Sequence, residues 1–220
     1  MSECVAVIAA LPREVALLVR GWRVQRRAGG VDVYTREGAV VACAGMGEAR
    51  AATAVGAAMA AAPVTRLISV GLAGACDPAL PVGSVVRPGL VVDTHSGERF
   101  RCSEALEVLV STHAIANVAE KQRLYASYSA SAVDMEAASV ARMARAHDLP
   151  FQAIKAISDD AGFELQELGR FATRDGQFRE VAFAAYAATR PKLWGKLLPL
   201  ARNSKRALRA LTLELEKELG

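Results

Sequence analysis

Four short segments of the sequence carry residues that could take part in chemistry, and each follows a short apolar run. They are residues 11–14, 45–47, 71–74 and 158–160. Two of them hold carboxylates, Glu14 and Asp159, which could give or take a proton, and two are glycine turns that let a backbone approach a ligand closely. Ligands of open α/β sheets bind at the carboxyl ends of strands, so these segments are the candidate site.

Each of these features, taken alone, also has a structural explanation. The glycine turns fit close helix–strand packing, and neither forms a complete G-x-G-x-x-G or phosphate-binding loop. Asp159 could cap a following helix, and Glu14 could be a first-turn acid that the helix dipole favours. Asp134 and Glu136 bracket the start of another helix, where carboxylates are common for the same reason. The order and spacing of these residues together carry more information than any one of them.

The elements that must position these segments are short apolar runs alternating with helical patterns. Strands are predicted over residues 5–10, 31–35, 40–44, 67–70, 82–86 and 151–157, and helices over 14–20, 48–62 and 135–148. Residues 106–110 fit either a strand or a helix. The alternation predicts an α/β fold with three layers, in which helices flank a central mixed, largely parallel β-sheet. No linker interrupts the pattern, so residues 1–220 are expected to form one domain.

Composition excludes several classes of protein. The chain has 220 residues, of which 52% are hydrophobic and 23% charged, so it can bury a full core and is not intrinsically disordered. Its four cysteines are scattered without a C-x-x-C pair, and its three histidines show no metal-ligand spacing, so we expect no disulfide scaffold and no metal site. No basic segment precedes the N-terminal apolar run, which indicates a cytoplasmic protein.

The basic charge is concentrated at the C-terminus. Residues 190–220 carry eight Lys or Arg and three Glu, a net charge of +5, so the rest of the chain has a net charge of −1. Pro199 divides this segment. On a helix, its apolar face would hold Leu197, Ala201, Ser204, Leu208, Leu211 and Leu215, opposite Lys196, Arg202, Lys205, Arg206 and Arg209.

The basic segment has three interpretations. The default is a terminal helix that covers the sheet and leaves its basic face in water. The sharper hypothesis is a peripheral helix that contacts anionic lipid at the inner face of the membrane, with Trp194 near the interface. Nucleic-acid binding lacks the interleaved aromatic residues it would need, so no nucleic-acid partner is expected.

Five motifs, taken in order, resemble those of the purine nucleoside phosphorylase and methylthioadenosine/S-adenosylhomocysteine nucleosidase family. They are VAVIAALPREVALL, AGMGEARAATA, ISVGLAGAC, VDMEAASVA and IKAISDDA, and they span residues 4–162. The resemblance implies cleavage of an N-glycosidic bond in a purine nucleoside and a homo-oligomer, commonly a dimer. It implies no metal or organic cofactor; phosphate is the co-substrate of the phosphorylases.

The resemblance also implies roles for individual residues. Asp159 would act as the general acid at N7 of the leaving base, and Glu14 would activate water. Glu136 would hold the ribose hydroxyls and stabilise the cationic sugar, against which Met135 would pack. The remaining implied contacts are Gly71, Ala73 and Gly74 through their backbone, Ser111, Ile115 and Ser158 near the base, and Arg13, Arg50 and Lys155 as candidate phosphate ligands.

The sequence departs from the family pattern at positions that bear on the nucleophile. Leu72 stands where the nucleosidases have Ser, Glu48 where they have Lys, and Lys155 where Arg is common. Water and phosphate therefore both remain open as nucleophiles. The base-binding region between residues 92 and 133 is short, and Ile115 or its neighbours replace an expected aromatic residue.

The segments LVSTHAIANVAEKQRL and YAATRPKLWGKLLPL resemble the hopanoid-associated phosphorylase branch of this family. Members of that branch are linked to release of adenine from adenosylhopane. The expected function is therefore a phosphorylase acting on an adenine nucleoside, with a lipid-linked nucleoside as substrate. Two alternatives are a hydrolytic nucleosidase acting on methylthioadenosine or S-adenosylhomocysteine, and a non-catalytic nucleotide-binding module in which Asp159 is only a cap.

Overall fold

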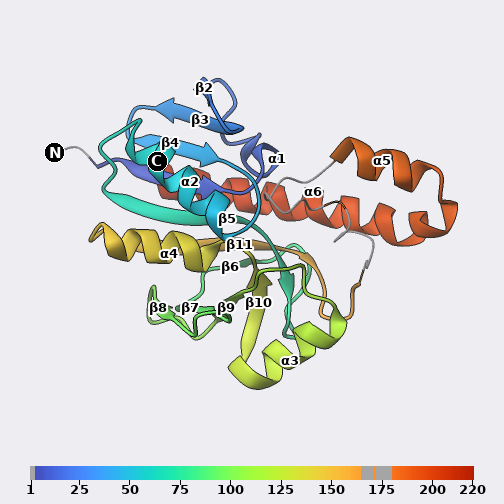
Figure 1. Cartoon of the computed structure of the whole chain (residues 1–220). Coiled ribbons are helices and arrows are strands. Elements are labelled where there is room, and N and C mark those ends of the chain that lie inside the picture. The colour runs from blue at the N-terminus through green and yellow to red at the C-terminus, as the bar shows by residue number, and fades with distance from the viewer. Residues whose placement is uncertain (1–2, 165–170, 172–179) are drawn as a thin grey trace.

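The computed structural model describes residues 3–164, 171 and 180–220 of the chain (Figure 1). Its strands are β1 (Val5–Ala9), β2 (Arg23–Arg27), β3 (Val31–Arg36), β4 (Ala39–Cys43), β5 (Arg66–Ala75), β6 (Val85–Val86), β7 (Leu90–Asp93), β8 (Arg99–Arg101), β9 (Val108–Ser111), β10 (Ala130–Asp134) and β11 (Phe151–Asp159). Its helices are α1 (Pro12–Val15), α2 (Glu48–Met59), α3 (Val118–Tyr128), α4 (Ala137–Ala146), α5 (Glu180–Ala188) and α6 (Pro191–Leu219).

The strands form one mixed sheet centred on β5. The main path runs β2-β3-β4-β1-β5-β10-β9-β7-β8, and β11 pairs with β5 and β6 beside it. Strand β5 is parallel to β1 and β11 but antiparallel to β10. Antiparallel hairpins form both edges, so the α/β class is confirmed, whereas the parallel character is limited to the interior pairs. The carboxyl ends of β1, β5 and β11 therefore meet at one edge, beside the end of β10.

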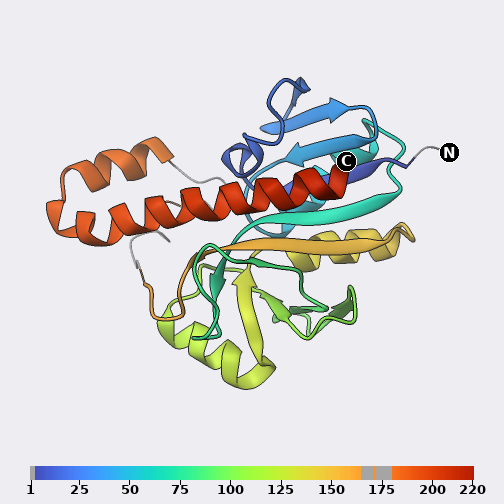
Figure 2. The ribbon, with the colours of Figure 1, turned by 180° about the vertical axis from the view of Figure 1, so that it is seen from behind.

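Helices cover both faces of this sheet. Helices α2 and α4 pack on one face, over a core that includes Ile8, Val40, Leu67 and Val140. Helix α6 crosses the opposite face, as the reversed view in Figure 2 shows, and its Leu211 and Leu215 pack with the core there. The three predicted layers are thus present, and the default interpretation of the C-terminal segment holds for the second half of α6.

The first half of α6 extends beyond the sheet and pairs with α5 (Figures 1 and 2). Pro199 lies inside this helix, so it does not divide the segment as predicted. Leu198 is 57% exposed on the projecting half, in contrast to fully buried Leu211 and Leu215. Among the helices of the described residues, none combines the length and apolar character needed to cross a membrane.

Two predicted elements differ from those in the structure, and other observed elements were not predicted. The helix expected over residues 14–20 is a single turn, Pro12–Val15, followed by turns that still bury Leu18. Residues 71–74 form no loop, because β5 continues through them and pairs with β11. Strands β2 and β10 and helix α3 were not predicted, although Asn117 caps α3 by accepting a hydrogen bond from the Glu120 amide at 2.8 Å.

Candidate active site

A cavity of about 200 Å³ opens where the carboxyl ends of β1, β5, β10 and β11 converge. It is lined by Ala10, Leu11, Arg13, Glu14, Met46, Leu72, Ala73, Gly74, Thr112, Ala114, Ile115, Ala116, Lys121, Val133, Asp134, Met135, Glu136, Ser158 and Asp159. Three of the four segments singled out in the sequence, residues 11–14, 71–74 and 158–160, contribute to this wall. Met46 is the cavity residue of the fourth segment, residues 45–47.

Glu14 is a buried carboxylate held by backbone amides at the cavity wall. Its Oε2 accepts hydrogen bonds from the amides of Ala10 and Leu11, both at 3.0 Å, and its Oε1 accepts one from Leu72 at 3.2 Å. A Cβ on Gly71 would lie 3.1 Å from both carboxylate oxygens, and the φ of Gly71 is +132°. Gly71 therefore makes room for Glu14 and does not itself line the cavity, contrary to the expectation of a backbone contact there.

Glu136 lies between the end of β10 and the start of α4. Its Oε1 accepts a hydrogen bond from the Gly47 amide at 2.8 Å, which joins the Gly45–Met46–Gly47 turn to the site. Burial, followed by repulsion from Asp134, raises the pKa of Glu136 to about 7, although the Lys155 ammonium opposes the shift. Glu136 can therefore change its charge near neutral pH.

Beneath Glu136, Lys155 and Asp134 form a buried ion pair. Nζ of Lys155 lies 2.8 Å from Oδ2 of Asp134 and donates to the Val70 carbonyl at 3.1 Å. Asp134 also accepts hydrogen bonds from Ser111 Oγ at 2.6 Å and from the Ala137 amide at 2.9 Å, so it also caps α4. Lys155 and Ser111 do not line the cavity. Lys155 is instead engaged with Asp134, and Ser111 lines a smaller adjoining pocket that shares Thr112 and Met135 with the cavity.

Asp159 ends β11 and pairs with a lysine from α3. Its Oδ1 accepts a hydrogen bond from Ser158 Oγ at 2.5 Å, and its Oδ2 forms an ion pair with the Lys121 ammonium. A turn follows Asp159 in the described residues, so it is not a helix cap. A Cβ on Gly74 would lie 2.9 Å from Oδ2 of Asp159 and 3.1 Å from Cε of Lys121, so this close approach requires glycine.

The other predicted residues divide into two groups. Ala73, Gly74, Ile115, Met135, Ser158 and Arg13 line the cavity, as expected. Arg50 does not, because it lies on α2 and donates to the Gly29 carbonyl at 2.6 Å. Of the three candidate phosphate ligands, only Arg13 reaches the cavity wall.

Sequence reasoning missed Lys121 as a cavity residue. A signal for Lys121 was available, because it lies three residues before Leu124 on α3 and shares that residue's buried face. A lysine on the apolar stripe of a helix needs a buried partner. Once α3 is recognised, Lys121 becomes a candidate for the site.

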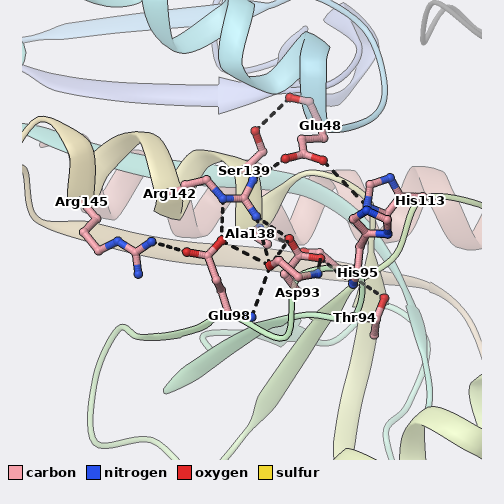
Figure 3. A network of polar contacts seen from close by, with 12 residues as sticks. Glu48, Asp93, Thr94, His95, Glu98, His113, Ala138, Ser139, Arg142 and Arg145 are labelled. Atoms are coloured by element: carbon pink, nitrogen blue, oxygen red, sulfur yellow. Dashed lines mark hydrogen bonds and ion pairs between the residues drawn. The ribbon is translucent and has the colours of Figure 1, made fainter.

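A polar network beside the cavity fixes the start of α2 (Figure 3). Arg142 of α4 forms ion pairs with Glu48 and Asp93 and bonds Glu98 through its Nε at 2.7 Å. Ser139 Oγ donates to the Glu48 carbonyl at 2.9 Å. Since Glu48 follows Gly47, this network positions the amide that binds Glu136. Among the described residues, no group of three or more His, Cys, Asp or Glu is placed to hold a metal ion.

A larger apolar groove adjoins the cavity and has a volume of about 860 Å³. It shares Arg13, Glu14 and Leu72 with the cavity wall. Its remaining lining comes from Leu17 and from α5 and α6, and consists of Phe183, Ala187, Ala188, Trp194, Leu197, Leu198, Leu200, Ala201, Ser204, Lys205, Leu208, Arg209 and Thr212. The projecting half of α6 therefore forms one wall of a groove that leads away from Glu14.

Comparison with protein families gives one match, which covers most of the chain. The family described as Phosphorylase superfamily matches residues 5–103 and 94–188. A search of curated proteins found no match.

Solved structures of similar fold include two enzymes from Helicobacter pylori. A 5′-methylthioadenosine/S-adenosylhomocysteine nucleosidase is 16% identical with a TM-score of 0.72, covering 98% of this chain and 97% of that one. A futalosine hydrolase is 17% identical with a TM-score of 0.68, covering 99% of each chain. A nucleosidase from Colwellia psychrerythraea in complex with adenine is 20% identical with a TM-score of 0.67, covering 97% and 96%. These likenesses show the fold.

Proposed function

Because the chain belongs to the phosphorylase superfamily, we propose that it hydrolyses the N-glycosidic bond of a purine nucleoside. The observation that carries the choice of water is Glu14, a buried carboxylate fixed on three backbone amides at the cavity wall. A negative charge held there suits a water nucleophile and repels phosphate. The relatives named as nucleosidase and hydrolase support the same choice.

In this mechanism, each of three carboxylates has its own role. As the bond between C1′ and N9 breaks, its electrons pass to the purine, which takes a proton at N7 from Asp159. Glu136 accepts hydrogen bonds from the ribose hydroxyls and stabilises the positive charge that develops on the sugar. Water attacks C1′ and gives its proton to Glu14. The products are the free purine and the free sugar.

The test is release of adenine from methylthioadenosine and adenosine, measured with and without phosphate. Hydrolysis predicts equal rates in both conditions and a free sugar as product. Asp159→Asn should lower the rate about a hundredfold or more, because it removes the proton donor. A rate that requires phosphate, with a sugar phosphate as product, would overturn the choice of water.

Phosphorolysis is the second candidate, and Arg13 is the observation that favours it. This residue lines both the cavity and the groove, so its guanidinium is the one candidate phosphate ligand of the three that reaches the site. Lys155 is engaged with Asp134, and Leu72 offers phosphate no side-chain hydroxyl. The phosphate-dependence assay separates the two candidates directly.

The apolar groove supports a further part of the proposal, which concerns the group at the 5′ position. A groove lined by Leu17, Trp194 and Leu198 next to Glu14 suits an apolar substituent. Adenosylhopane, whose substituent is a hopanoid, is the largest substrate of this type that we propose to test. Methylthioadenosine is the smallest.

We also propose that the protein contacts a membrane surface and forms a dimer. Trp194 is 47% exposed and Leu198 57% exposed on the projecting half of α6, beside basic residues of the same helix. Flotation of the whole protein with anionic vesicles should exceed flotation with zwitterionic ones, and Trp194→Ser with Leu198→Ser should abolish the difference. Equal flotation with both vesicles would exclude anionic lipid binding. Light scattering in solution would test the expected dimer.

A further inference from the structure

Lys121 is a buried ammonium whose bonds all converge on the loop that carries Asp159. The residue is 2% exposed. Besides its ion pair with Asp159, Nζ donates to the carbonyls of Asp160 at 2.8 Å and of Phe163 at 3.3 Å. Three acceptors occupy the three protons of the ammonium group. A lysine this buried is costly unless it is paired, and its charged partner here faces the cavity.

The pairing bears directly on how the purine is protonated. The Lys121 ammonium is bonded to the side chain that gives the purine its proton in the proposed mechanism, so a proton given up by Asp159 can be replaced from Lys121. Asp159 has one further side-chain partner, the hydroxyl of Ser158, which donates to it and adds no charge. The source of the proton for the leaving base is therefore the Lys121–Asp159 pair and not Asp159 alone.

In the described part of the chain, the titratable groups next to this pair include Asp160, Glu120 and Cys76. Glu120 precedes Lys121 on α3 and forms an ion pair with Arg123. Cys76 follows β5, and burial raises the pKa of its thiol to about 12, although the positive charge of Lys121 opposes the shift. Cys76 is therefore neutral near pH 7 and adds no charge beside Asp159.

We propose that Lys121 is a positioning residue for departure of the base, which supplies through Asp159 the proton that the purine receives. As the C1′–N9 bond breaks, the purine takes its proton at N7 from Asp159, and a proton of Lys121 moves along the ion pair to Asp159. Glu14 accepts the proton of the attacking water. Lys121 and Glu14 then return to their starting states by exchange with solvent. The inference rests on the proposed N-glycosidic cleavage.

The test compares two leaving groups in the whole protein. Methylthioadenosine releases adenine, which needs a proton, whereas 4-nitrophenyl β-D-riboside releases a phenolate, which is stable without one. In Lys121→Met and Lys121→Gln we expect adenine release to slow by about 10- to 100-fold, the scale of general acid catalysis, and phenolate release to change by less than about threefold. Lys121→Arg keeps the positive charge but cannot give up a proton, so it should slow adenine release as the two neutral replacements do.

A double variant links the effect to Asp159. If Lys121 acts through Asp159, then Lys121→Gln should cost little in the Asp159→Asn background, because the group it serves is absent. Equal slowing of both leaving groups, or fully additive losses, would overturn the proposal and leave Lys121 a structural residue. If the unaltered protein releases neither adenine nor phenolate, the proposed function itself fails. Two neutral replacements guard against one of them failing to fold, which a thermal melt would reveal.

Discussion

Glu136 is a buried carboxylate of the cavity whose charge changes near neutral pH. Burial and the nearby Asp134 raise its pKa to about 7, well above that of an ordinary glutamate. In the free protein the ionised fraction therefore falls from about nine tenths at pH 8 to about one tenth at pH 6. In the proposed mechanism, the ionised form is the one that accepts hydrogen bonds from the ribose hydroxyls.

We therefore expect kcat/KM to fall as pH decreases through about 7, where the free protein loses the ionised form. Initial rates at substrate concentrations below KM, measured from pH 5 to 9, would show this acid limb. A limb near the ordinary glutamate pKa would contradict the assigned environment. Glu136→Gln, which cannot ionise, should lower activity strongly across the whole range.

Gly74 offers a test of the close approach between β5 and the Lys121–Asp159 pair. A methyl group there would lie 2.9 Å from the Asp159 carboxylate, so Gly74→Ala should displace the pair and reduce activity about tenfold or more. The matched control is Gly56→Ala, since a Cβ there would meet nothing within 4 Å. That helical substitution should leave activity unchanged and stability equal or slightly higher. Equal effects of the two substitutions would exclude the steric argument.

For individual residues, local sequence patterns identified the three carboxylates but not the residues that pair with them or pack against them. Glu14, Glu136 and Asp159 stand at the ends of apolar runs or at a helix start, which local patterns reveal. The pairing of Lys121 with Asp159 joins residues 38 positions apart, and α3 itself was not predicted. The role of Gly71 is likewise a consequence of where Glu14 folds back, which no local pattern records.

The C-terminal half of helix α6 buries one of its faces against the sheet and exposes the other. Leu215 is fully buried against the sheet, whereas Leu213 on the same helix is 59% exposed. Leu215→Ala should therefore lower the free energy of unfolding by about 2–5 kcal/mol, and Leu213→Ala by less than about 0.5 kcal/mol. Chemical denaturation would measure both. Similar losses for the two variants would mean that the helix does not dock on the sheet.

Elements with strong local periodicity were predicted well, and those set by distant partners were not. The interior strands β1, β4 and β11 and the helices α2 and α4 follow directly from apolar runs and helical spacing. Strand β5 was predicted to end at Val70, before its glycines. It continues because β11 pairs with it along residues 67–74, an arrangement that only the tertiary structure supplies.

Across the whole molecule, the charge of the C-terminal segment is separated along α6. Its three glutamates lie at 214, 216 and 218; Glu214 pairs with Arg87, which follows β6, and Glu218 pairs with Arg66 of β5. Seven basic residues lie between positions 190 and 209. They lie on the half of α6 that projects beside the groove or in the residues that directly follow that half. The acidic end therefore anchors the helix, and the basic half lies next to the route into the cavity.

The groove beside this basic half predicts how activity depends on the 5′ substituent. In a series of 5′-alkylthioadenosines, each methylene that enters the groove should contribute about 0.8 kcal/mol, which is about a fourfold gain in kcat/KM. The gain should continue over several methylenes, because the groove has a volume of about 860 Å³. Adenine release from each member of the series would measure it.

Two serine substitutions on α6 show whether the groove is responsible for that gain. Leu198 lines the groove and is 57% exposed, so Leu198→Ser should reduce the gain for long chains and leave methylthioadenosine unaffected. Leu213, 59% exposed but outside the groove, provides a matched control in which the gain should persist. A series without any dependence on chain length would exclude the groove as the site of the 5′ substituent. Because the carboxylates lie in the cavity and not on α6, adenine release from methylthioadenosine would still be expected in that case.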